Sequence, residues 1–233
     1  MSTFFQAGII SGLLQGIYDG NMNCKELAKH GDIGLGTFNG VDGEMIALDG
    51  VFYRVDANGR TSIANPDALT PFSVVCLYEP TIVFSINAIN NFDELNKILD
   101  QHLKTKNIFY ITRIDADIDW IKLRSEGCQT LPYKPLAETL PSMQHIFELT
   151  HLKGTLVTTR CPSYSANVTI AGFHHHFISQ DKKIGGHVFD VKFKNAQVNI
   201  TPLRNFSMAL IDSNEFDTAN LEIDTTSMLS KTE

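Results

Sequence analysis

Four of the chain's eight histidines lie in one short segment, GFHHHFISQDKKIGGHV at residues 172–188. Successive side chains of a β-strand point to opposite faces, so His174 and His176 share one face while His175 points to the other. The intervening SQDKKIGG has the composition of a hairpin turn, and an antiparallel return brings His187 back beside the first strand. The spacing therefore predicts that His174, His176 and His187 converge from neighbouring strands. His175 is left for packing or for supporting a ligand.

Three neutral imidazoles form a ligand set for one divalent metal ion per chain. They leave the ion its full positive charge and leave coordination positions open for water or substrate, as in catalytic zinc sites. The all-imidazole set, without an adjacent carboxylate, favours zinc, although the same spacing suits iron or manganese. A polar strand face with incidental histidines and a pH-sensitive surface patch are the alternatives. The H-x-H pair alone fits these alternatives as well as a metal site, and the third histidine placed by a turn favours the metal site.

Composition limits the possible partners of the chain. The 233 residues are 43% hydrophobic and 19% charged, as in an ordinary globular protein. The net charge of −7 and the lack of a Lys/Arg run argue against a nucleic-acid partner. The four cysteines form no C-x-x-C pair, which favours reduced thiols and a cytoplasmic location.

Two apolar segments could be mistaken for membrane or export signals. AGIISGLL near the N-terminus has no Lys or Arg before it, so we interpret it as a helix of the mature protein. PFSVVCLYEPTIVFSINAI is interrupted by Glu79 and Pro80 and cannot form a spanning helix. We therefore expect no membrane partner.

The remaining pattern predicts an α+β protein with mixed or antiparallel sheets and a few flanking helices. Asp-Gly and Asn-Gly pairs divide residues 31–64 into consecutive hairpins. Other elements follow from periodicity: helices at 4–20, 23–31 and 90–103, strands at 72–79 and 81–89, two strands within 107–127, a proline-marked connector at 131–140, and strands through most of 154–212. We expect one unit over residues 1–233 with two similar-sized subdomains. These are an N-terminal α/β half, 1–130, and a β-rich half, 131–233, with the metal site on its hairpin and a C-terminal tail.

Several segments together resemble the α-acetolactate decarboxylase family. GTFNGVDGEMIALDGVFYRVDANG and the histidine segment carry the likeness, and LLQGIYDG, NIFYITRID and LPYKPLAE occur in the family's order. The resemblance implies decarboxylation of the small molecule 2-acetolactate to (R)-acetoin and CO₂ through a zinc-stabilised enediolate. It also implies a homodimer, no organic cofactor, and zinc held by His174, His176 and His187.

The resemblance assigns four further residues. The family's glutamate in DGEM falls on Glu44, its arginine on Arg124 in IKLRSEG, its threonine on Thr37 in GTF, and a tail glutamate on Glu233. Glu44, with Glu233 as rival or partner, is the expected proton donor. Arg124 is expected to orient the substrate's oxygens, and Thr37 to hydrogen-bond substrate or a ligand. The sequence SEGCQTLP after this arginine departs from the family's commoner Ser-Val-Pro, so the loop there is expected to differ.

Taken without the resemblance, these residues have simpler readings. Glu44 could be an exposed carboxylate in a turn, and Arg124 could pair with Asp119 or Glu126. Arg113 is a rival for any anion-binding role. Two other functions stay open at this stage. One is a different three-histidine metalloenzyme, such as a cupin-like oxygenase or isomerase, and the other is a non-catalytic metal-binding protein.

Overall fold

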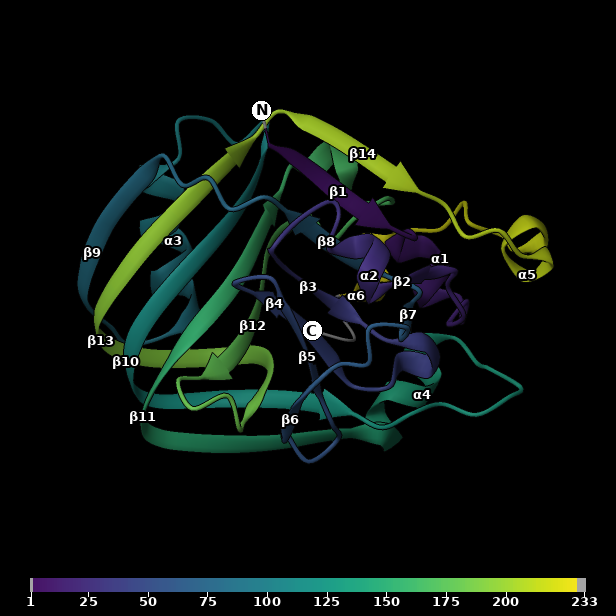
Figure 1. Ribbon diagram of the computed structural model, residues 1–233, viewed down its shortest axis with the longest axis horizontal. Coiled ribbons are helices and arrows are strands. Elements are labelled where there is room, and N and C mark those ends of the chain that lie inside the picture. Colours follow the sequence, from purple (N-terminus) through teal and green to yellow (C-terminus); the bar gives the residue numbers. More distant parts are fainter. Residues whose placement is uncertain (1, 230–233) are drawn as a thin grey trace.

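Two large β-sheets and several short helices make up the computed structural model, which describes residues 2–229 (Figure 1). The strand order of the first sheet is β14-β1-β8-β3-β4-β5-β6. Its members are β1 (Thr3–Ala7), β3 (Ile33–Thr37), β4 (Glu44–Leu48), β5 (Val51–Val55), β6 (Thr61–Ile63), β8 (Ser73–Cys76) and β14 (Asn205–Ala209). All neighbours are antiparallel except β1 and β14, so the sheet is mixed, as predicted.

The second sheet has five strands in the order β10-β11-β12-β13-β9. Its members are β9 (Ile82–Ile89), β10 (Phe109–Glu126), β11 (Gln144–Cys161), β12 (Gly172–Ser179) and β13 (Gly185–Leu203). β10 also pairs with β13, so β13 has partners on both sides near its beginning. A separate two-stranded sheet joins β2 (Met22–Asn23) to β7 (Leu69–Thr70).

The division of the chain into two subdomains at residue 130 stays a prediction. Each large sheet takes strands from both of the proposed segments.

The consecutive hairpins expected in residues 31–64 are present as β3, β4, β5 and β6. Asp49 and Gly50 form the turn between β4 and β5 and have φ values of 54° and 77°. Positive φ at both central positions is the requirement of the tight hairpin turn that Asp-Gly favours. The sequence therefore predicted this part of the fold correctly from its turn residues.

Three local predictions were wrong. The N-terminal segment is not one helix, because residues 3–7 form β1 between β8 and β14, and Gly8, at φ 67°, separates it from helix α1 (Ile10–Leu14). Residues 109–126 form one long strand, since β11 and β13 pair along almost all of it. The expected connector contains helix α4 (Leu136–Met143), whose Leu136 and Leu140 are buried.

Side-chain caps begin two of the predicted helices. α2 (Cys24–Leu27) has a capping box, in which the Asn23 side chain accepts from the Glu26 N–H and Glu26 accepts from the Asn23 N–H. In α3 (Phe92–His102) the Asn91 side chain accepts from the Glu94 N–H. α3 then packs Leu95 and Leu99 onto the five-stranded sheet. Near the end of the chain lie α5 (Asn214–Thr218) and α6 (Thr225–Leu229).

The two sheets share a hydrophobic core where they meet. Ile46 and Leu48 of β4 belong to the same cluster as Val157 of β11 and Ile178 of β12. This contact brings the beginning of β4 beside the histidine strand, and β4 and β12 are in contact. Within residues 2–229, no helix has the length and apolar character needed to cross a bilayer.

Candidate functional site

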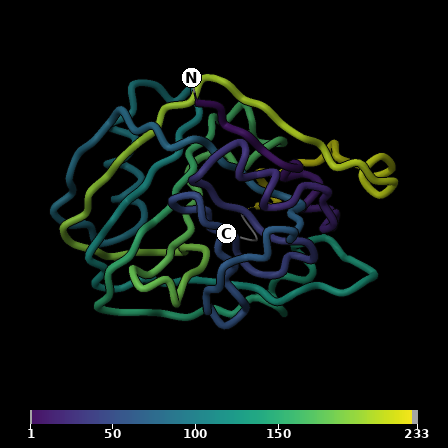
Figure 2. The backbone as a smooth tube through the Cα atoms, viewed as in Figure 1, coloured from purple at the N-terminus to yellow at the C-terminus, as the bar shows by residue number. Residues whose placement is uncertain are grey.

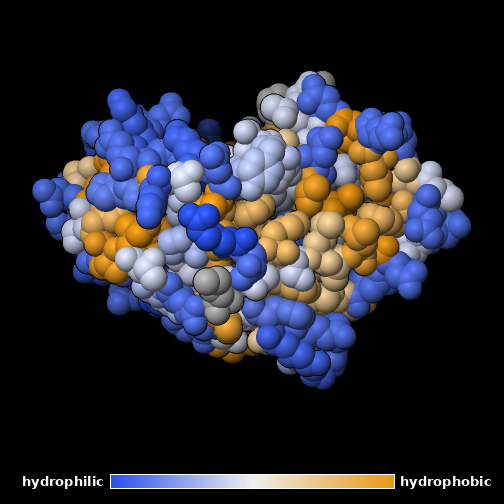
Figure 3. Space-filling model, turned by 90° about the horizontal axis from the view of Figure 1, so that it is seen from above, coloured by the Kyte–Doolittle hydropathy of each residue, from blue (hydrophilic) through white to orange (hydrophobic). Residues whose placement is uncertain are grey.

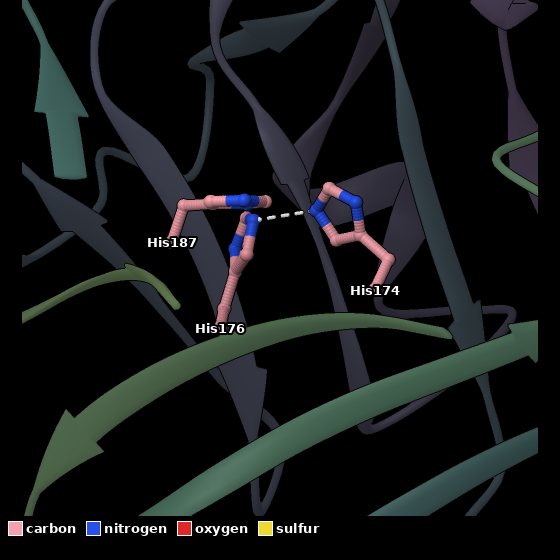
Figure 4. A group of neighbouring side chains, drawn as sticks. All are labelled: His174, His176 and His187. Atoms are coloured by element: carbon pink, nitrogen blue, oxygen red, sulfur yellow. Dashed lines mark hydrogen bonds between the residues drawn. The ribbon is translucent and has the colours of Figure 1, made fainter. Parts of the chain in front are cut away.

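The predicted hairpin brings the three histidines together. His176 of β12 and His187 of β13 are direct partners in the antiparallel register, and His174 lies two residues earlier on the same face. Figure 4 shows the three imidazole rings pointing toward one another. All three residues are buried, and their ligand atoms lie within 4.8 Å of one another. The convergence expected from strand alternation is therefore present.

The electrostatic state of this cluster suits a metal ion. His176 Nδ1 lies 2.9 Å from the backbone oxygen of Met45, an interaction that fixes Nδ1–H as the donor and leaves Nε2 for a ligand. His176 Nε2 lies 3.0 Å from His174 Nε2. Burial, together with the neighbouring His174 and His187, lowers the pKa of His176 well below its ordinary value. A neutral imidazole is the form that binds metal, so the state of His176 and the convergence of the three ligand atoms fit a divalent ion.

His175 points away from this cluster, as strand alternation predicts. It is fully buried, with Nδ1 2.7 Å from Thr158 Oγ1 and Nε2 2.9 Å from Asn96 Oδ1. Its ring also meets the Phe92 ring edge-on at 4.5 Å and lies near the Phe173 ring. His175 therefore connects β12 to β11 and α3, and its role is structural.

Glu44 begins β4 and lies beside the histidines. Its Oε2 is 3.2 Å from His176 Nε2, and the residue is only 4% exposed. The simple reading of an exposed turn carboxylate is therefore wrong. Thr37 is the register partner of Glu44, and its Oγ1 donates a hydrogen bond of 2.7 Å to the backbone oxygen of Gly43. Gly43 has a φ of 79°, and a Cβ there would lie 1.8 Å from the backbone oxygen of Val55, so this turn needs glycine.

Arg124 enters the same site from β10, directly opposite His187 in the register with β13. Its Nη2 lies 3.9 Å from Glu44 Oε1, and its Nε lies 3.8 Å from Glu126 Oε2. The guanidinium carbon is 5.2 Å from the centre of the Phe189 ring, within range of a cation–π interaction. Arg124 is therefore a buried cation between two carboxyl groups.

The rival pairings lie elsewhere. Asp119, one predicted partner of Arg124, has its Oδ2 3.2 Å from Lys194 Nζ. Arg113, the other candidate for anion binding, pairs with Asp115 and Asp49, each at 2.8 Å. Its charge is therefore engaged by two carboxylates outside the histidine pocket.

One pocket contains most of these groups. Its polar end is lined by Thr37, Glu44, Arg124, Glu126, His174 and His176. The apolar wall is lined by Ile10, Leu13, Leu35, Val41, Phe72, Leu136, Leu140, Ile170 and Leu229. Polar groups thus gather at one end of a mostly hydrophobic cavity, which is the usual form of a small-molecule site.

Sequence analysis missed Glu126 as a member of the pocket and considered it only as a partner for Arg124. The two residues are two positions apart on one strand, so alternation puts both on the same face. Burial raises the pKa of Glu126 above its ordinary value, although the nearby Arg124 opposes that effect. The spacing alone was the signal that could have placed it in the site.

Glu233 lies outside the described residues, but the chain leading toward it reaches the pocket. The Thr225 hydroxyl at the start of α6 donates to the backbone oxygen of Ala166 at 2.9 Å. Met228 and Leu229 pack against the cluster that contains α1 and α4, and Leu229 lines the cavity. α6 is therefore part of the pocket wall.

Known proteins match this chain along nearly all of its length. The family model for alpha-acetolactate decarboxylase matches residues 4–223. The alpha-acetolactate decarboxylase of Methylococcus capsulatus is 41% identical over 217 residues, covering 93% of this chain and 83% of that protein. The one from Brevibacillus brevis is 35% identical, covering 100% and 81%. The crystal structure of the Bacillus subtilis strain 168 enzyme superposes with a TM-score of 0.96 at 32% identity and 99% coverage of both chains. The chain belongs to the alpha-acetolactate decarboxylase family.

Proposed function

We propose that this chain converts 2-acetolactate to (R)-acetoin and CO₂ at the histidine pocket. One observation carries the proposal: a buried three-histidine cluster, a carboxyl group and a buried arginine meet in a single pocket. The substrate is small, and it joins one carboxylate and two oxygen functions to two methyl groups. The polar end of the pocket suits the oxygens, and its apolar wall suits the methyl groups.

Arg124 is the residue that would bind the substrate's carboxylate. It supplies the cationic side chain among the described residues lining the pocket, and its planar fork can hold a carboxylate through two parallel hydrogen bonds. The apolar wall excludes water, which strengthens electrostatic interactions inside the pocket. Arg124 would thereby fix the bond that breaks relative to the histidines.

His174, His176 and His187 would hold one divalent ion, and we propose zinc. When bound, the ion supplies a Lewis acid for the negative charge that develops on the substrate's oxygens. The electron pair of the broken C–C bond passes into the adjacent ketone and gives an enediolate. Because the substrate's own ketone accepts these electrons, no organic cofactor is needed.

The enediolate must gain a proton on one face to give a single acetoin enantiomer. Glu44 is our candidate donor, since its carboxyl is buried at the polar end of the pocket, beside His176. Glu233 is the alternative proton donor, or a second one beside Glu44, because the resemblance to the family places a glutamate in the tail. Thr37 would help indirectly, because its hydrogen bond to Gly43 holds the turn from which Glu44 enters the pocket.

Two measurements on the purified protein test this function. Incubation with racemic acetolactate is expected to release CO₂, and chiral chromatography is expected to show (R)-acetoin. Metal analysis is expected to give about one zinc ion per chain, the stoichiometry of a single three-histidine site. No CO₂ release would refute the proposal, and bound iron with O₂ consumption would instead indicate an oxygenase.

We also propose a homodimer in the cytoplasm. β14 is an edge strand of the seven-stranded sheet, and Phe206 and Met208 on it are partly exposed, as is Leu210 just beyond it. Figure 3 views the molecule from above and shows hydrophobic residues gathered on part of that face. An uncharged edge strand is suited to pairing with a second copy. Light scattering after size-exclusion chromatography tests the dimer, and fractionation of the source cells tests the location.

A further inference from the structure

Glu126 is the last residue of β10 and has no role assigned by the resemblance to the family. It lies on the same strand face as Arg124, is 4% exposed, and lines the pocket beside Glu44, His174 and His176. A buried carboxyl group costs folding free energy unless its oxygens are hydrogen-bonded. Its presence at the polar end of the pocket therefore requires a physical reason.

One oxygen of this carboxyl group has no hydrogen-bond donor among residues 2–229. Glu126 Oε2 is buried, and the Nε of Arg124, at 3.8 Å, is beyond hydrogen-bond distance. The hydroxyl of Thr37, another polar group of the pocket, already donates to Gly43. The Glu44 carboxyl also lies within hydrogen-bonding reach of the Glu126 carboxyl. Native structures leave few buried acceptors without a donor, so Oε2, which accepts from no described residue, is open to a donor on a bound ligand.

The chemistry of the substrate supplies a single matching group. Acetolactate has three kinds of acceptor, the carboxylate, the ketone and the hydroxyl oxygen, but only one donor, its tertiary hydroxyl. Arg124 suits the carboxylate because it is a cation, while an acceptor such as Glu126 suits the hydroxyl. The carboxylate and the hydroxyl are attached to the same carbon. Their two protein partners lie two residues apart on one strand, with their Cα atoms about 7 Å apart.

We propose that Glu126 is a substrate-binding residue whose Oε2 accepts a hydrogen bond from the hydroxyl of the 2-hydroxy-3-oxo acid. This inference rests on the proposed function, and it adds a reason for substrate choice. Arg124 and Glu126 together recognise the 2-hydroxy acid unit. A 3-oxo acid without the hydroxyl leaves the buried oxygen unpartnered and binds more weakly, a penalty that discriminates strongly in buried sites.

Two carboxylic acids that differ only in the hydroxyl test the contact. We would measure the inhibition or dissociation constants of 2-hydroxy-2-methylpropanoate and 2-methylpropanoate for the metal-loaded protein. The wild-type protein is expected to prefer the hydroxy acid. In Glu126→Met, which keeps side-chain length but removes both oxygens, the hydroxy acid should bind at least about tenfold more weakly, the scale of a hydrogen bond to a charged group. The acid without the hydroxyl should change less than about threefold.

A second variant and a control separate binding from structure. Glu126→Asp keeps the charge near Arg124 but withdraws the oxygens by about 1.5 Å, and it should also lose much of the preference. If Glu126→Met does not fold or does not hold metal, Glu126→Asp serves as the test of the contact with the hydroxyl. Glu79→Met, at an exposed position between β8 and β9, should behave as the wild type.

The outcomes distinguish this contact from the proposed function. Equal weakening of both acids in the variants would mean that Glu126 only supports Arg124, and an unchanged preference would mean no contact; either result overturns the inference. If the wild-type protein releases no CO₂ but its preference for the hydroxy acid depends on Glu126, the contact stands and the proposed function fails. If CO₂ is released and the preference is independent of Glu126, only the contact fails.

Discussion

The opposite roles of His175 and its two neighbours on β12 predict opposite results for alanine substitutions. His175→Ala removes a buried ring and leaves Thr158 Oγ1 and Asn96 Oδ1 without their hydrogen bonds of 2.7 and 2.9 Å. Two lost hydrogen bonds and the edge-on contact with Phe92 are together worth about 3 kcal/mol of unfolding free energy. For a chain of this size that corresponds to a fall in melting temperature of about 6–12 °C.

The same variant should still bind metal with full stoichiometry, because the His175 ring points away from the cluster. His174→Ala and His187→Ala are expected to lose bound metal and activity, since each removes one of three buried ligand atoms. Metal content by mass spectrometry and melting by calorimetry, on the same samples, separate the two effects. A His175→Ala protein without metal, or a His174→Ala protein with its metal and activity intact, would refute the assignment of strand faces.

The remaining predictions concern the other groups of the pocket. Arg124→Lys should lower kcat/KM by at least about tenfold although charge is conserved, because an ammonium cannot replace the guanidinium's paired donors; an unchanged kcat/KM would contradict this. Glu44→Gln should keep metal and fold but lower turnover by about 10²-fold, the scale for losing a general acid, and unchanged turnover would remove it from the mechanism. Deleting residues 229–233 should largely preserve melting temperature and zinc content while reducing turnover or the enantiomeric excess of acetoin; wild-type rate and chirality would show that the tail, Glu233 included, is dispensable.

Strand alternation and turn residues were enough to predict the cluster of three histidines. Both rules act locally, within the seventeen residues from 172 to 188, and both describe backbone geometry that every strand and hairpin shares. Glu44 and Arg124 could not be placed by such rules. Their positions depend on how two sheets pack, and only the resemblance to a family pointed to them.

Two of the wrong local predictions also failed because pairing between distant strands overrides the local pattern. Phe4 and Phe5 have helical spacing with later apolar residues, but pairing with β8 and β14 makes their segment a strand. The alternating Asp115, Asp117 and Asp119 resemble a break between strands. In the fold they lie along one face of β10, where Thr155, Lys153 and Lys194 neutralise or hydrogen-bond them.

The pairing of the first and last strands of the seven-stranded sheet has a consequence for how the protein is made. β1 lies between β8 and β14, and its partner Asn205–Ala209 is about 200 residues further along the chain (Figure 2). At usual rates of synthesis, a ribosome needs about 10–40 s to cover that distance. During this interval one edge of the nascent strand TFFQA has no strand to pair with, so its backbone N–H and C=O groups on that side stay unpaired. The newly made chain should therefore depend on chaperones or on rapid completion of synthesis to escape aggregation.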